Sequence, residues 1–281
     1  MSNRPILIRA NELHAKLNDP NLAIVDGSWH LPNANRDPFF EYTSGHIEGA
    51  HFFDIDEIAD RSSGLPHTLP TNEHFANCVG AMGISNSDEI VVYDAAGMFS
   101  AARVWWMLKS YGAQNVRVLD GGLPAWKSAG FAVTDKKPSP NRVEFVAQLN
   151  KDQTVPLPQM REFVKAGESQ ILDARGAGRF FGQEAEPRAG TRSGHMPGAT
   201  NVPFSTLLND DGTFKSNEEL SVLFSNQGLD LSAPTIATCG SGVTAAIILL
   251  ALELIGKTDA RLYDGSWAEW GSLSDTPVEI D

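Results

Sequence analysis

The sequence repeats itself once along its length, and this repeat limits the fold more than any other feature. Four short blocks of the first half return in the same order in the second half, shifted by about 144 to 149 residues. The paired positions are Asp26 and Asp173, His46 and His195, Asp94 and Cys239, and Asp120 and Asp264. The 281 residues are therefore expected to form two similar domains, each long enough to bury its own core.

Within each half, short runs of β-branched residues alternate with longer helical patterns, as in residues 90–108. This alternation predicts an α/β fold in which each domain has a mostly parallel central sheet flanked by helices. The prolines and charges of residues 135–142 are typical of a connector. We expect an N-terminal domain over residues 1–140, a linker over 141–155 and a C-terminal domain over 156–281.

Composition excludes several classes of partner. The chain is 42% hydrophobic and 20% charged, and its apolar runs are too short to span a bilayer. Its net charge of −13 repels nucleic acid and anionic membrane surfaces on average. The first nine residues lack the apolar stretch of a signal peptide. We expect a cytoplasmic protein that binds neither nucleic acid nor membrane.

Cys239 is the best candidate for a catalytic residue. It lies between a strand-like run at 234–238 and a buried helical stretch at 243–253, in a turn that contains Gly240 and Gly242. Two glycines allow successive N–H groups to converge into a nest for an anion, and the helix start adds partial positive charge. These surroundings favour a nucleophilic thiolate over a merely buried, inert cysteine.

The other cysteine and the first repeat provide two contrasts. Cys78 has no such loop around it, so we expect a structural role. Two cysteines are too few for a disulfide framework or a four-thiolate site, and the expected chemistry needs no metal or organic cofactor. Asp94 stands where the second repeat has Cys239, so the first repeat has no thiolate at this position. The first domain is therefore expected to be non-catalytic.

Three motifs together resemble the tandem-rhodanese sulfurtransferases over essentially the whole chain. They are the loop at residues 239–245, the paired Gly-His-x-x-Gly-Ala blocks, and the Asp-Gly-Ser-Trp run at 264–267. Within that family, a Cys-Gly-Ser-Gly-Val-Thr loop looks like the branch that uses 3-mercaptopyruvate. The resemblance implies a small-molecule sulfur donor, a Cys239 persulfide, a thiol such as thioredoxin or cyanide as acceptor, and release of pyruvate.

Loop charge agrees with the mercaptopyruvate branch. Thiosulfate leaves as doubly charged sulfite, which basic residues after the cysteine would stabilise, whereas Gly240 and Ser241 are neutral. The backbone of the loop is expected to hold the substrate sulfur through Gly240, Gly242, Val243 and Thr244.

The mercaptopyruvate branch also implies two arginines that bind the substrate, and these match Arg179 and Arg188. Guanidinium forks suit a carboxylate and an adjacent keto oxygen. The alternative is that these are surface arginines paired with Glu184 or Glu186. Arg175 and Arg192 are weaker candidates.

The resemblance further implies a Ser, His and Asp group beside the cysteine, which maps onto Ser241, His46 and Asp37. Ser241 would pass on the proton of the substrate thiol, His46 would be the base, and Asp37 would fix its tautomer. A structural role in a turn is the alternative for His46, because His195 occupies the same place in the second repeat.

Three rival functions follow from the same residues. A thiosulfate sulfurtransferase differs only in its donor, and only the neutral loop opposes it. A phosphatase loop of the form Cys-x5-Arg would need arginine where this chain has Ala245, so phosphatase activity is not expected. A rhodanese-like binding or regulatory module would not need the complete thiolate loop around Cys239.

Overall fold

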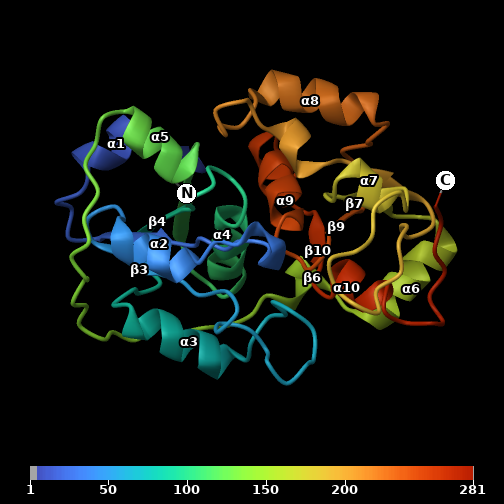
Figure 1. The fold of residues 1–281 in the computed structure, drawn as a ribbon, viewed down its shortest axis with the longest axis horizontal. Helices are drawn as coiled ribbons and strands as arrows, with labels where there is room; N and C mark the ends of the chain where they lie inside the picture. The colour runs from blue at the N-terminus through green and yellow to red at the C-terminus, as the bar shows by residue number, and fades with distance from the viewer. Residues whose placement is uncertain (1–4, 281) are drawn as a thin grey trace. The chain divides into compact units, whose positions relative to one another are not determined.

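The computed structural model describes residues 5–280 (Figure 1), and the chain divides into two compact units. Unit 1 comprises the chain up to Ala59, Leu69–Asn150 and Leu208–Phe214. Unit 2 comprises Asp60–Thr68, Lys151–Leu207 and the chain from Lys215 on. Each unit therefore contains one short segment from the other half of the sequence.

Unit 1 contains a five-stranded sheet in the order β1-β5-β4-β2-β3, in which every neighbouring pair is parallel. The strands are β1 (Leu7–Ile8), β2 (Leu22–Asp26), β3 (Ala50–Phe52), β4 (Glu89–Tyr93) and β5 (Asn115–Leu119). Its helices are α1 (Ala10–Ala15), α2 (Pro38–Ser44), α3 (Asn72–Ala81), α4 (Ala101–Ser110) and α5 (Gly122–Ser128), with a 3-10 turn, η1, at Pro32–Ala34.

Unit 2 repeats this arrangement with the order β6-β10-β9-β7-β8, again all parallel. Its strands are β6 (Thr154–Val155), β7 (Gln170–Asp173), β8 (Ala199–Asn201), β9 (Thr235–Thr238) and β10 (Arg261–Tyr263). Its helices are α6 (Leu157–Ala166), α7 (Ala177–Phe180), α8 (Asn217–Asn226), α9 (Ala245–Leu254) and α10 (Ser266–Trp270), with 3-10 turns η2 (Lys151–Gln153) and η3 (Phe204–Leu207). The predicted α/β fold with two similar domains is confirmed.

The central strand of each sheet leads into a buried helix. All five residues of β4 and all four of β9 are buried, including Glu89 at the start of β4 and the two threonines of β9, as expected for the central strand of a parallel sheet with both faces covered. Helix α9 is buried from Ala245 to Leu252 and packs on β9, β10 and β7. Asp94 and Cys239 directly follow β4 and β9, at the carboxyl ends where ligands bind in parallel sheets.

The predicted linker has no regular structure up to residue 150, but it is anchored. The backbone N–H of Val143 donates to Gly80 at 3.0 Å, and that of Gln148 donates to Tyr111 at 3.1 Å. Phe145 is buried against the ring of Phe75. These contacts hold residues 143–150 to unit 1, and the chain enters the second segment of unit 2 at Lys151.

No helix within residues 5–280 is both long enough and apolar enough to cross a bilayer.

Candidate functional site

The loop that carries Cys239 is clamped by the first turn of α10. The N–H of Cys239 donates to the Ser266 hydroxyl at 3.3 Å, and the carbonyl of Cys239 accepts from the Trp267 N–H at 2.9 Å. The next carbonyl, that of Gly240, accepts from the Ala268 N–H at 2.8 Å. Cys239 itself is 2% exposed. The Asp-Gly-Ser-Trp motif therefore fixes the position of the cysteine.

The remainder of the loop offers unused hydrogen-bond donors. Within residues 5–280, the backbone N–H groups of Gly240, Ser241, Val243 and Thr244 have no protein acceptor. Gly242 adopts a φ of 78°, in the left-handed region that favours glycine. A buried N–H without a partner is costly, so donors gathered in one turn before a helix favour a bound anion.

Ser241 contacts a histidine that sequence reasoning missed. The His67 Nδ1 lies 3.0 Å from the Ser241 hydroxyl, and His67 is 3% exposed. His67 has a φ of 61°, which is uncommon for a non-glycine residue. It lies on the segment Asp60–Thr68, whose ends are joined by the Asp60 N–H donating to the Thr68 carbonyl at 2.8 Å. A closed loop of unit 2 thus presents His67 to the turn that carries Cys239.

His46, which was predicted to be the base, has a different environment. Its Nδ1 lies 2.8 Å from the Tyr42 carbonyl and its Nε2 lies 3.1 Å from the Lys136 carbonyl. Its ring stacks on Tyr42, with centroids 4.2 Å apart. His195 repeats this pattern in unit 2, stacked on Phe180 with its Nδ1 3.0 Å from the Phe180 carbonyl. These contacts argue for a turn-stabilising role, because both ring nitrogens of His46 face backbone carbonyls.

Asp37 also has a structural task. It is exposed, and its carboxylate caps α2 by accepting the Phe40 N–H at 3.0 Å. This contact opposes its predicted role of orienting His46, whose nitrogens face other groups.

The two predicted substrate arginines lie on or near α7 in unit 2. Arg179 is the last residue but one of α7, and its guanidinium reaches the loop that carries Cys239: a Cβ added to Gly240 would lie 3.0 Å from its Nη2. Arg179 is indeed paired with Glu186, as the alternative held, but this carboxylate is buried rather than on the surface. Arg188 follows two residues after Glu186 and is half-buried.

The two weaker arginine candidates are committed to structure. Arg175 is 2% exposed and is paired with Asp173 at 2.7 Å. Arg192 donates to the carbonyls of Thr276 at 2.9 Å and Gly271 at 3.1 Å, and so ties down the chain after α10.

The first repeat lacks the Arg175 equivalent, and this affects a buried carboxylate. Ser28 replaces it beside Asp26, which is 1% exposed, and burial raises the pKa of Asp26 to about 6. Hydrogen bonds from Ser28 and Tyr93 oppose the rise but do not cancel it. Between about pH 4 and 6 the folded state therefore holds a proton that the unfolded state releases, so Asp26 makes the protein less stable as pH rises through this window.

Asp26→Asn is expected to remove this pH dependence. Relative to wild type, the variant should gain stability between pH 4 and pH 7.5 by up to about 3 kcal/mol, at about 1.4 kcal/mol per pKa unit. Asparagine keeps an oxygen for the Ser28 N–H, which Asp26 accepts at 2.9 Å. Denaturant unfolding at the two pH values measures the effect, with Asp37→Asn at the exposed cap as control. The prediction would be contradicted if Asp26→Asn and the wild type differed in stability by the same amount at both pH values.

Asp94 occupies the first-repeat counterpart of the cysteine position and fills its own loop. One oxygen accepts the Ala96 N–H at 2.9 Å, and the other accepts those of Phe99, Ser100 and Ala101 at 2.8 to 2.9 Å. The carboxylate is 1% exposed. The loop of unit 1 is thus an anion cradle whose anion is part of the chain.

Neither Cys78 nor a metal cluster offers a second reactive centre. Cys78 is half-buried in α3, and burial raises the pKa of its thiol, which disfavours the reactive thiolate. In the part of the chain that the structure describes, no group of three or more His, Cys, Asp or Glu residues is arranged to hold a metal ion.

Known proteins share both the sequence and the fold. The rhodanese-like domain matches residues 9–129 and again residues 157–273. A 3-mercaptopyruvate sulfurtransferase from Homo sapiens is 43% identical over 263 residues, covering 93% of this chain and 89% of that protein. A thiosulfate sulfurtransferase from Rattus norvegicus is 44% identical over 254 residues, covering 89% and 85%.

A solved structure agrees with these relatives. The crystal structure of SseA from Escherichia coli, described with the rhodanese fold and the mechanism of 3-mercaptopyruvate sulfotransferases, matches with a TM-score of 0.84 and 36% identity. The match covers 94% of this chain and 99% of that chain. With two matched domains and relatives of this similarity along nearly its whole length, the chain belongs to the rhodanese family.

Proposed function

We propose that this protein is a sulfurtransferase that moves sulfane sulfur from 3-mercaptopyruvate through a Cys239 persulfide to a thiol or to cyanide. The observation that carries the proposal is a buried cysteine in a turn of unused N–H donors, with the Arg179 guanidinium against Gly240. The human relative named 3-mercaptopyruvate sulfurtransferase supports the same donor.

In the first half-reaction, the Cys239 thiolate attacks the sulfur of mercaptopyruvate. A new S–S bond forms, the C–S bond breaks, and its electron pair leaves on carbon as the enolate of pyruvate. The thiol proton of the donor goes to this carbon, so that the products are Cys–S–S⁻ and pyruvate. Arg179 and Arg188 hold the carboxylate and keto oxygen of the donor and stabilise the enolate.

The Ser241 and His67 pair carries the proton in this step. The geometry suits a relay in which Ser241 takes the proton of the donor thiol and passes its own to His67 Nδ1, 3.0 Å away, after which the proton returns by the same path to the enolate carbon. This direction requires the tautomer of His67 with Nδ1 unprotonated. The unused N–H groups of the loop hold the outer sulfur of the persulfide as an anion.

In the second half-reaction an acceptor removes the outer sulfur. Cyanide attack releases thiocyanate and restores the thiolate, and a dithiol such as that of thioredoxin instead becomes a disulfide while hydrogen sulfide leaves. Both routes are ping-pong, and both suit the cytoplasmic location that we propose. Cell fractionation with an antibody to the protein would test the location.

Mass spectrometry tests the function. Wild-type protein mixed with mercaptopyruvate and no acceptor should gain one sulfur atom on the peptide that contains Cys239, with an equal amount of pyruvate released. Absence of sulfur on that peptide would end the proposal.

Thiosulfate is the second candidate donor, because the rat relative of similar identity is named for it. The neutral Gly240 and Ser241 favour mercaptopyruvate. A kcat/KM for thiosulfate equal to or above that for mercaptopyruvate would reverse the choice of donor and leave the persulfide chemistry intact.

His67→Asn is expected to slow sulfur loading from mercaptopyruvate by about 10²-fold, because the Ser241 hydroxyl loses its proton acceptor. The single-turnover rate of pyruvate release measures it. His46→Asn is the matched control and should retain that rate per folded molecule, since its ring faces backbone carbonyls. If the rate of pyruvate release fell more in His46→Asn than in His67→Asn, His46 would be the base.

A further inference from the structure

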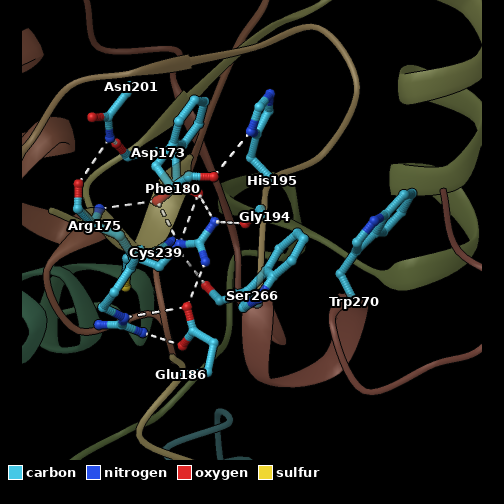
Figure 2. Close-up of polar contacts among 12 residues, drawn as sticks. Asp173, Arg175, Phe180, Glu186, Gly194, His195, Asn201, Cys239, Ser266 and Trp270 are labelled. Carbon is cyan, nitrogen blue, oxygen red and sulfur yellow. Dashed lines mark hydrogen bonds and ion pairs between the residues drawn. The ribbon is translucent and has the colours of Figure 1, made fainter. Parts of the chain in front are cut away.

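Glu186 is a buried carboxylate shared by two arginines (Figure 2). Its side chain is 3% exposed. Its Oε1 accepts from Arg175 Nη1 at 2.7 Å and from Arg179 Nε at 3.2 Å, while its Oε2 accepts from Arg179 Nη2. A buried carboxylate is costly unless paired, and here both of its oxygens are used.

The Arg175 side of this bridge is buried and held by several contacts. Its Nη2 donates to Asp173 at 2.7 Å and to the Gly194 carbonyl at 2.9 Å, and its side chain is 1% exposed. The guanidinium also lies over the Trp267 ring, 4.3 Å from its centroid. Asp173 ends β7, so the anchor of Glu186 is tied to the sheet. Figure 2 shows these contacts converging on one guanidinium beside Glu186.

The Arg179 side of this bridge faces the loop that carries Cys239. Glu186 takes the Nε–Nη2 edge of this guanidinium, whereas its Nη1 has no protein partner within residues 5–280. The side chain is 19% exposed, and Nη2 lies against Gly240, where a Cβ would be only 3.0 Å away. One edge of Arg179 is therefore fixed next to the residue that follows Cys239, and the other is open to a ligand.

We propose that Glu186 is a positioning residue that selects the donor: anchored by Arg175, it aims the open edge of Arg179 at the carboxylate and keto oxygen of an α-keto acid. The inference rests on the proposed function. A flexible arginine without this partner would have to lose its rotamer freedom on binding, which weakens affinity.

Charge gives Glu186 a second effect on the choice of donor. The row Asp173, Arg175, Glu186, Arg179 alternates in sign and has no net charge. Removing the charge of Glu186 makes the surroundings of the loop more positive by one unit. The electrostatic attraction to the loop then increases more for doubly charged thiosulfate than for singly charged mercaptopyruvate. Mercaptopyruvate also loses its contact with a correctly oriented Arg179 guanidinium.

The test compares both donors in Glu186→Gln. The expected result is a fall of about 10-fold or more in kcat/KM for mercaptopyruvate, mainly through KM, with kcat/KM for thiosulfate unchanged or raised. Glu184→Gln is the matched control, since Glu184 is exposed on the same segment, and it should change neither donor. General damage to the fold would lower kcat/KM for both donors together, and that outcome overturns the proposal.

A double-mutant cycle with Arg179→Ala asks whether Glu186 acts through Arg179. In the Arg179→Ala background, Glu186→Gln should cause no further loss with mercaptopyruvate, because its target is gone. Independent, additive losses would overturn the proposal. If Glu186→Gln is poorly folded by thermal melting, Glu186→Asp replaces it, which keeps the charge, shortens the reach, and should lose mercaptopyruvate use without gaining thiosulfate use.

Sulfur loading of the wild type separates this inference from the proposed function. If mercaptopyruvate places no sulfur on wild-type Cys239, the proposed function fails first. If the wild type is loaded and the Glu186→Gln variant keeps its KM for mercaptopyruvate, only the positioning role fails.

Discussion

Cys239→Ser is expected to reduce turnover with mercaptopyruvate and cyanide by at least about 10³-fold and to abolish sulfur loading of the protein. Serine fits the same buried site, but its hydroxyl is a poor nucleophile and cannot hold sulfur through an S–S bond. The fold should remain, because the clamp on this residue uses its backbone N–H and carbonyl. Thiocyanate formation and the intact mass after incubation with donor are the two measurements.

Cys78→Ser provides the control for the nucleophile. Its thiol is half-buried in α3 and has a raised pKa, so turnover should equal that of the wild type. Sulfur found on Cys78 in the Cys239→Ser variant, together with retained turnover, would contradict the assignment.

Asp94→Ala is expected to lower the free energy of unfolding by about 3–5 kcal/mol, because it leaves four N–H groups, two of them buried, without their carboxylate. Denaturant unfolding gives the size of the loss, and hydrogen exchange in β4 and α4 places it in unit 1. Sulfate should restore part of the stability of this variant, since the emptied turn binds anions.

Asp37→Ala is the matched comparison for Asp94. Its carboxylate is exposed and accepts one N–H at the start of α2, so its loss should cost only about 1 kcal/mol. Equal destabilisation by the two variants would mean that the cradle of Asp94 contributes no more than an ordinary helix cap.

The sequence alone was sufficient for the features that depend on local pattern. Ordered blocks at a nearly constant shift predicted two similar domains, and the β-branched run before Cys239 predicted a buried strand that leads into a helix. The glycines of the loop predicted a turn whose N–H groups converge, because backbone freedom at Gly242 is a property of the residue itself.

Sequence could not place His67, and the reason is topological. The family resemblance mapped the expected base onto His46, whose place in the second repeat is taken by His195, and both histidines contact backbone carbonyls close by in the chain. His67 has no counterpart that pattern would reveal. It comes from the first half of the sequence, yet its segment belongs to the compact unit of the second half.

Tertiary structure also decided what the charged residues do. Spacing could not tell whether Glu184 or Glu186 pairs with Arg179, since both are within reach along the chain; burial between two guanidiniums selects Glu186. From the sequence, Asp94 showed only that the first repeat lacks the cysteine. The tertiary structure shows that its carboxylate accepts the N–H groups of its own loop. Local sequence thus determined the elements and the nucleophile, whereas long-range packing determined which side chains share hydrogen bonds, because those partners are distant in the chain or chosen by burial.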